Sequence, residues 1–212
     1  RASLAAACKS VDEVITTAST TFSRQPGDSI EMTDQAGQLA LVAAAKAARI
    51  RHFVYTSYSN QIDHTANPCA LTVAKRTVEK ALQESGMTYT ILRPTYYMQI
   101  WLSPAVGFDA PNATAAIYGL GEKKISWISI YDVAEFAVES LDHPAARNAV
   151  LELGGPEALS PLEVVKIYEE VTGRPFTVNH VPVETLEVQR ASATDSLSEA
   201  FAALMSAGIP YL

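Results

Sequence analysis

The sequence of 212 residues has few groups of the kind that bind metals or form disulfide frameworks. Its two cysteines, Cys8 and Cys69, lie far apart and have no CxxC spacing, and its four histidines have no HxH or HxxxH spacing. We therefore predict no metal site. A disulfide between the two cysteines is one alternative, but two inert thiols in a reduced, cytoplasmic protein is the interpretation we favour.

Positive charge and long apolar runs are also scarce. Acidic residues outnumber basic ones by 23 to 16, which gives a net charge of −7 and repels a phosphate backbone. No apolar run approaches the roughly 20 residues that a helix needs to cross a bilayer. We therefore expect neither a nucleic acid nor a membrane as partner.

A glycine-rich dinucleotide loop of the form GxGxxG, which would hold a pyrophosphate at a helix N-terminus, is missing as well. Gly119-x-Gly121 has Lys124 where the third glycine would fall, and it lies between two predicted strands. Gly154-Gly155 is followed by Pro156, which has no amide to offer a phosphate. Both segments are interpreted as plain turns.

The first half of the sequence does contain alternating helices and strands. Helices are predicted for residues 2–9, 33–48 and 71–84, and strands for 11–18, 51–57 and 88–93. Crossovers of this length join adjacent parallel strands in right-handed βαβ units. The fold class is therefore predicted to be α/β, with a Rossmann-like parallel sheet, helices on both faces, and its first strands missing.

The second half predicts a small C-terminal α/β lobe. Two short strands, residues 115–118 and 124–128, are joined by a turn, and a helix to residue 141 starts with a capping box of Ser129 and Asp132. The remaining predicted elements are a strand at 149–153, a helix at 160–171 with a capping box begun by Ser160, a strand-like segment at 176–183, and a helix at 196–206. We divide the chain approximately into residues 1–142 and 143–212, with the two lobes interleaving.

Five motifs carry a resemblance to a known family. They are VYTS at 54–57, KxxxE at 75–79, SGMTYTILRP at 85–94, ISxxDVA at 128–134 and LGGPxxLS at 153–160. In their order and spacing the chain resembles the NmrA-like family of NAD(P)-binding proteins, an atypical group of short-chain dehydrogenases.

This resemblance implies an N-terminally truncated chain whose missing part carried the glycine loop. It implies NADP or NAD as cofactor, with NADPH favoured, and an oxidoreductase that transfers hydride from NAD(P)H to a small quinone-like or aromatic acceptor. One alternative is a non-catalytic NAD(P)-sensing regulator that acts through a protein partner. Another is a fragment that binds no nucleotide.

The resemblance also points to Lys75. Short-chain dehydrogenases pair such a lysine with a tyrosine four residues earlier, which protonates the substrate oxygen. Here that position holds Leu71, so the catalytic acid stays unknown. An alternative for Lys75 is a surface ion pair with Glu79 one helical turn later.

Residues that follow the predicted strands are expected to line the ligand site, because ligands of open α/β sheets bind beyond the carboxyl ends of the strands. The expected cofactor-binding residues are Thr17, Ala18, Ser57, Lys75, Pro94 and Thr95. The expected substrate-binding residues are Tyr58, Tyr96, Tyr97, Met98 and Trp101. The alternatives are that Ser57 caps its own backbone and that the aromatic residues pack under the C-terminal lobe.

Overall fold

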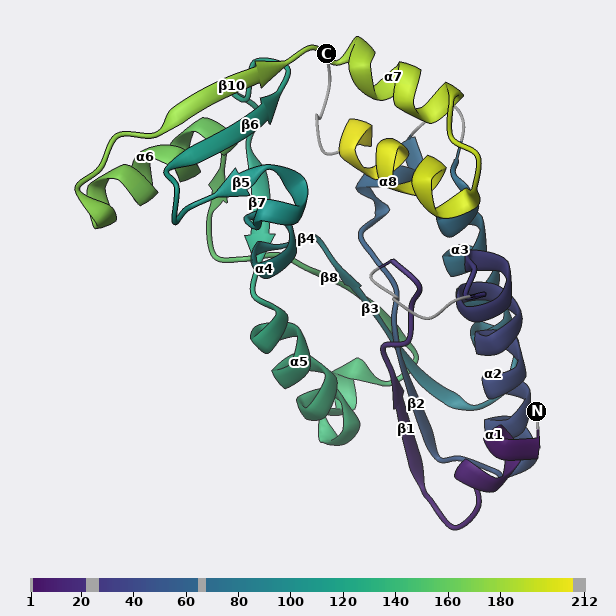
Figure 1. The fold of residues 1–212 in the computed structure, drawn as a ribbon. Coiled ribbons are helices and arrows are strands. Elements are labelled where there is room, and N and C mark those ends of the chain that lie inside the picture. The colour runs from purple at the N-terminus through teal and green to yellow at the C-terminus, as the bar shows by residue number, and fades with distance from the viewer. Residues whose placement is uncertain (1, 22–26, 65–67, 208–212) are drawn as a thin grey trace.

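The computed structural model describes residues 2–21, 27–64 and 68–207 (Figure 1). A sheet of four parallel strands, in the order β1-β2-β3-β8, forms the centre of the larger lobe. The strands are β1 (Glu13–Thr16), β2 (His52–Thr56), β3 (Thr88–Pro94) and β8 (Ala149–Leu153). The prediction that residues 11–18, 51–57 and 88–93 form adjacent parallel strands is confirmed.

Helices cover both faces of this sheet, as Figure 1 shows. Phe53 and Tyr55 of β2 point to one face and pack with α2 and α3, whereas Val54 and its neighbour Leu92 point to the other face and pack with α5. This alternation along a fully buried strand is the expected period of two. The helices are α1 (Ala2–Ala7), α2 (Gln38–Ala47), α3 (Ala70–Gln83) and α5 (Ile130–Asp142). The predicted α/β fold class is confirmed.

The helix predicted from residue 33 starts earlier, as a π-helical segment, η1 (Ile30–Gly37), that continues into α2. Ser29 begins the segment, and its Oγ accepts a hydrogen bond of 3.2 Å from the Met32 amide. A Cβ on Gly37 would lie 3.0 Å from the Met32 carbonyl oxygen, so the lack of a side chain suits this widened turn. π-Helical turns often occur at functional sites, and this one carries the buried Asp34 against α3.

The smaller lobe contains two three-stranded sheets and α6 (Pro161–Thr172). The two predicted strands at 115–118 and 124–128 are present, but they belong to different sheets and do not pair with each other. One sheet holds β5 (Phe108–Asp109), β6 (Thr114–Tyr118) and β10 (Thr177–Val181), and the other holds β4 (Tyr96–Tyr97), β7 (Ile125–Ile128) and β9 (Ala158–Leu159). Phe108, Tyr168 and Phe176 form an aromatic cluster in the core between β5 and α6.

The caps of two helices differ in how well the sequence predicted them. The capping box of Ser160 and Glu163 at α6 is confirmed. At α5 the predicted capping box is not formed: Ser129 Oγ accepts from the Tyr131 amide, and Gln99 of α4 (Met98–Trp101) accepts from the Ile130 amide. A side chain from another element thus satisfies one of the amides in the first turn of α5.

The chain passes between the lobes more than once. Strand β8 follows residue 142 yet belongs to the main sheet, while β5, β6 and β7 precede residue 142 and lie in the smaller lobe. After β10, α7 (Glu184–Ala191) and α8 (Ser196–Ala207) pack on each other, and α8 returns to α3. Helix α7 was not predicted, since Leu186 is its one buried residue. The short helical turns are η2 (Asn60–His64), η3 (Pro104–Val106) and η4 (Pro144–Ala146).

Within the described ranges, no helix is long and apolar enough to span a bilayer. The thiols of Cys8 and Cys69 are both free and buried, and they lie in different apolar clusters.

Candidate functional site

A cavity of about 420 Å³, called here the sheet-end cavity, lies beyond the carboxyl ends of β1, β2 and β3. This is within the roughly 300–1,000 Å³ of small-molecule sites, and the place is where open α/β sheets bind ligands. Residues after the three strands form its floor, and side chains of α3, α5 and α8 form its walls. Its lining includes Thr17, Ser19, Thr21, Thr56, Ser57, Tyr58, Ser59, Leu71, Lys75, Pro94, Thr95, Tyr96, Tyr97, Ile100, Trp101, Ile130, Val133, Ala134, Ala137, Phe201 and Leu204.

The structure brings together the predicted site residues at this cavity, except for Ala18 and Met98. Ala18 is exposed, and its carbonyl accepts a hydrogen bond of 2.9 Å from Gln38. Met98 packs instead against the core of the smaller lobe. The side chains of Ala18 and Met98 therefore do not line the sheet-end cavity.

Lys75 is buried in the wall of the cavity. Its Nζ lies 3.5 Å from Asp34 Oδ1, 3.4 Å from the Thr56 carbonyl oxygen, and 5.4 Å from the centre of the Tyr55 ring. Burial lowers the pKa of Lys75, and the negative charge of Asp34 opposes that shift. The alternative of a surface ion pair between Lys75 and Glu79 is wrong.

Asp34 holds this lysine from a fixed position. Its Oδ2 accepts hydrogen bonds from the amide (2.9 Å) and the hydroxyl (2.5 Å) of Thr20, so its Oδ1 is left to face Lys75. Asp34 was not among the predicted site residues. The available signal was that Asp34 precedes the buried Gln38 and Val42 at intervals of four residues, which places a carboxylate on the buried face of a helix.

Several polar atoms at the cavity have unused hydrogen-bonding capacity. Both oxygen contacts of Lys75 are longer than the roughly 2.7–2.9 Å of a charge-assisted hydrogen bond. Among the described residues, the buried hydroxyls of Thr56, Thr95 and Tyr96 have no hydrogen-bond partner. Buried polar groups are normally paired, so these hydroxyls have hydrogen-bonding capacity that the described residues leave unused.

Glu79 belongs to a structural network beside the cavity. Its carboxylate accepts hydrogen bonds of 2.6 Å from both Arg76 and Arg93, which ties α3 to β3. Burial raises the pKa of Glu79, but hydrogen bonds from Arg93 and Ser57 and the charge of Arg76 outweigh that and lower it overall. Arg76 also donates to Ser57 Oγ and to the Tyr58 carbonyl, so it fixes the loop after β2. The Ser57 hydroxyl thus bonds to Arg76 rather than capping its own backbone.

Aromatic rings form one wall of the cavity. Tyr96 meets Trp101 edge to face with ring centres 5.0 Å apart, and Trp101 stacks on Phe201 at 6.4 Å with planes 9° apart. Phe201 comes from α8, and no local pattern in the sequence could have placed it here. Burial raises the pKa of Tyr97 to about 12 and raises the pKa of Tyr96 as well, so both hydroxyls stay protonated.

Leu71 lies on the same wall as Lys75, one turn earlier on α3, and is buried. At this point the cavity presents a hydrocarbon side chain. The tyrosine that the resemblance associates with proton transfer has no counterpart at this position.

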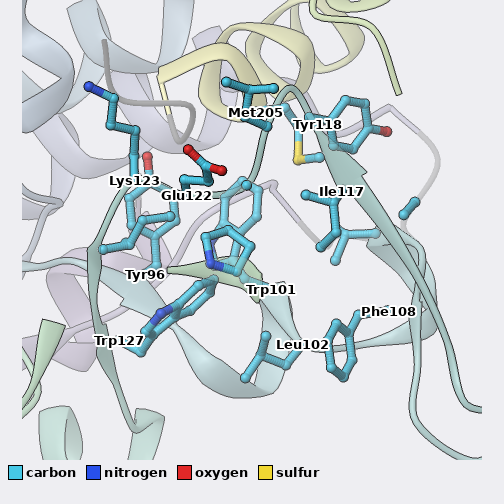
Figure 2. A pocket seen from close by; sticks show the side chains of 16 residues that line it. Tyr96, Trp101, Leu102, Phe108, Ile117, Tyr118, Glu122, Lys123, Trp127 and Met205 are labelled. Atoms are coloured by element: carbon cyan, nitrogen blue, oxygen red, sulfur yellow. The ribbon is translucent and has the colours of Figure 1, made fainter. Parts of the chain in front are cut away.

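A second cavity of about 360 Å³, called here the lobe cavity, lies within the smaller lobe (Figure 2). It shares Tyr96 and Trp101 with the sheet-end cavity. The rest of its lining is Leu102, Val106, Phe108, Ala116, Ile117, Tyr118, Leu120, Gly121, Glu122, Lys123, Ile125, Trp127, Pro161 and Met205. The Nε1 of Trp127 donates to the Leu159 carbonyl at 2.9 Å.

Comparison with known proteins assigns the family. The sequence profile of the NmrA-like family matches residues 1–206. This chain belongs to the NmrA-like family.

Two curated relatives illustrate the range of proteins that this NmrA-like chain is similar to. It is 31% identical over 168 residues to the NAD(P)H azoreductase of Xenophilus azovorans, covering 79% of this chain and 56% of that protein. It is 27% identical over 161 residues to the photosystem II assembly factor Ycf39 of Trieres chinensis, covering 76% of this chain and 50% of that protein. The chain therefore spans about half the length of these relatives.

Solved structures confirm the fold of the NmrA-like chain. The NADPH-dependent quinone oxidoreductase of Escherichia coli, solved with NADPH, has a TM-score of 0.74 at 23% identity, covering 97% of this chain and 69% of that chain. The leucoanthocyanidin reductase of Vitis vinifera, solved with NADPH, has a TM-score of 0.75 at 18% identity, covering 100% of this chain and 72% of that chain. At these identities the likeness shows the fold alone.

Proposed function

We propose that this protein is an NAD(P)H-dependent oxidoreductase that transfers hydride to a small quinone-like or aromatic acceptor, with NADPH as the favoured cofactor. Membership of the NmrA-like family and similarity to an NAD(P)H azoreductase support the reaction class. The observation that carries the proposal is the sheet-end cavity, where the buried ammonium of Lys75 lies near an aromatic wall.

The polar groups of the sheet-end cavity fit the nicotinamide and ribose part of such a cofactor. Ribose hydroxyls and a carboxamide both donate and accept hydrogen bonds, and the cavity offers the Lys75 ammonium and the unpaired hydroxyls of Thr56 and Thr95. A bound reduced nicotinamide would supply the hydride. Since the sequence holds no GxGxxG loop, the assignment to this chain covers only the nicotinamide and ribose side.

The remaining side chains would bind and orient the acceptor. Tyr97 and Trp101 offer flat apolar area to an aromatic ring and exclude water from it. The buried hydroxyl of Tyr96 can donate a hydrogen bond to an acceptor oxygen, but its raised pKa makes it a weak acid. Leu71 stands in the place of an acid, and a quinone suits such a site. Hydride transfer to a quinone gives a hydroquinone monoanion, a stable product that can take its second proton from water.

The test uses the full-length protein, with reduction of 1,4-naphthoquinone followed by the loss of NADPH absorbance. Lys75→Ala is expected to weaken NADPH binding, measured by calorimetry, by about 1–3 kcal/mol through lost charge-assisted hydrogen bonds. Lys80→Ala is the matched control, because Lys80 is on the same helix with its side chain 75% exposed. Tyr97→Ala is expected to raise KM for the quinone and to leave NADPH affinity nearly intact.

Unchanged NADPH affinity in Lys75→Ala would show that Lys75 does not bind the cofactor, and the proposal would lose its main support. Calorimetry is run well below the unfolding temperature of each variant, so that a loss of folding is not read as a loss of binding.

A second function, a non-catalytic NAD(P)-sensing regulator that acts through a protein partner, is favoured by two observations. The cavity presents Leu71 where a catalytic acid is expected, and relatives of the chain include photosystem II assembly factors. If NADPH binds but no quinone or aromatic carbonyl is reduced, and NADPH changes the affinity for a partner protein, this second function replaces the first.

A further inference from the structure

The sheet-end cavity and the lobe cavity share part of their walls. Tyr96 and Trp101 line both cavities. Helix α8 passes both, since Leu204 lines the sheet-end cavity and the next residue, Met205, lines the lobe cavity. Figure 2 shows Tyr96, Trp101 and Trp127 grouped on one side of the lobe cavity. The two spaces are thus neighbours across an aromatic partition.

The lobe cavity is chemically unlike the sheet-end cavity. Its walls are mostly aliphatic and aromatic side chains of β5, β6 and β7, among them Phe108, Ile117 and Ile125. The Trp127 ring N–H is already bonded to a backbone carbonyl. The charged side chains Glu122 and Lys123 lie in the turn between β6 and β7. Away from this turn, a ligand part that fills the space contacts mainly apolar side chains.

The Tyr96 hydroxyl is a polar atom of the partition that a ligand extending across it could bond. Tyr96 is 8% exposed, and its hydroxyl has no hydrogen-bond partner among the described residues. A hydroxyl at the junction can donate to an oxygen on a ring, while apolar atoms continue into the lobe cavity. The sheet-end cavity has an aromatic wall, the Tyr96 hydroxyl is a hydrogen-bond donor, and the lobe cavity is mainly apolar. Together they match an amphiphilic molecule with an oxygenated ring and a hydrocarbon tail.

We infer that the two cavities are compartments of a single acceptor site, in which the lobe cavity binds the apolar tail of a quinone whose ring lies in the sheet-end cavity. This inference rests on the proposed function for the position of the ring. Trp101, stacked on Phe201 and half-buried, is the side chain that has to shift for the tail to pass. The substrate class is therefore narrowed to quinones with an alkyl or isoprenoid side chain.

The experiment compares 1,4-benzoquinone with 2-decyl-1,4-benzoquinone in the full-length protein. Because each buried methylene strengthens binding about fourfold, kcat/KM is expected to be at least about tenfold higher for the tailed quinone. The same preference is expected in calorimetric affinities measured with NADP⁺, where no hydride can be transferred.

Two matched variants locate the tail. Ala116→Phe adds a ring to the lobe cavity, and Ala134→Phe adds the same ring to the sheet-end cavity. Ala116→Phe is expected to lower the ratio of kcat/KM for tailed over untailed quinone about tenfold. Ala134→Phe is expected to lower both values together and to keep the ratio. If Ala116→Phe does not fold, the calorimetric comparison in the wild type still tests the inference.

Equal affinity and equal kcat/KM for the two quinones would overturn the inference and leave the proposed function standing. An Ala116→Phe variant that folds and keeps the wild-type ratio would also overturn it. If neither quinone is reduced but the tailed one binds more tightly and Ala116→Phe abolishes that advantage, the tail compartment is supported and the proposed reaction fails.

Discussion

Asp34→Asn is expected to destabilise the protein strongly, because it leaves the ammonium of Lys75 buried without its counter-charge. The two side chains are 0% and 6% exposed, with Oδ1 and Nζ 3.5 Å apart. At an effective dielectric constant of 20, this separation corresponds to a Coulomb attraction of about 5 kcal/mol. Breaking a buried pair from one side costs about 3–5 kcal/mol, which is the loss expected in the free energy of unfolding.

Changing the other partner of the pair, in Lys75→Met, is expected to lower the free energy of unfolding by less, about 1–3 kcal/mol. Asp34 keeps the two hydrogen bonds from Thr20, and methionine fills the volume of the lysine stem. The double variant should therefore be more stable than the sum of the single losses predicts, by about 2–3 kcal/mol.

The measurement is a double-mutant cycle by urea unfolding at pH 7. The control is Lys80→Met on the same helix, whose contact with Glu84 is 3.9 Å long with both side chains well exposed, and which should change stability by less than about 0.5 kcal/mol. A coupling energy within about 0.5 kcal/mol of zero would refute the reasoning. It would mean that water reaches the pair and screens it in the folded protein.

Two further predictions concern pH and backbone packing. Burial lowers the pKa of Lys75 below its ordinary 10.5, so between the lowered pKa and 10.5 the unfolded chain binds more protons than the folded protein. Lys75 should therefore make the free energy of unfolding increase as the pH rises across that window. In urea unfolding of Lys75→Met, this increase should be absent. Gly155→Ala should cost about 1–3 kcal/mol, because the added Cβ would lie 1.8 Å from the Trp127 carbonyl oxygen. A loss below about 0.5 kcal/mol in urea unfolding would show that the loop after β8 has room to move away from β7.

Local patterns in the sequence were enough for the main sheet and for part of the site. The periodicity of apolar residues predicts the strands at 51–57 and 88–93 and the helix between them. Two strands joined by one crossover helix pair in parallel, as these two do. The capping box at Ser160 involves residues three apart, so it too is visible locally. Lys75, in contrast, was predicted from the resemblance to the NmrA-like family, and its side chain lines the sheet-end cavity.

Contacts between distant segments decided the rest. The partner of Lys75 is Asp34 rather than Glu79, because burial of the α3 face brings η1 against it. Strand β6 pairs with β10 and not with β7, although β7 follows it directly in the chain. Phe201 and Met205, which help to close the two cavities, come from a helix near the end of the described chain. Short-range propensities select helices, strands and caps, whereas the choice of partners depends on which apolar faces are buried together. That choice is made only when the whole chain has packed.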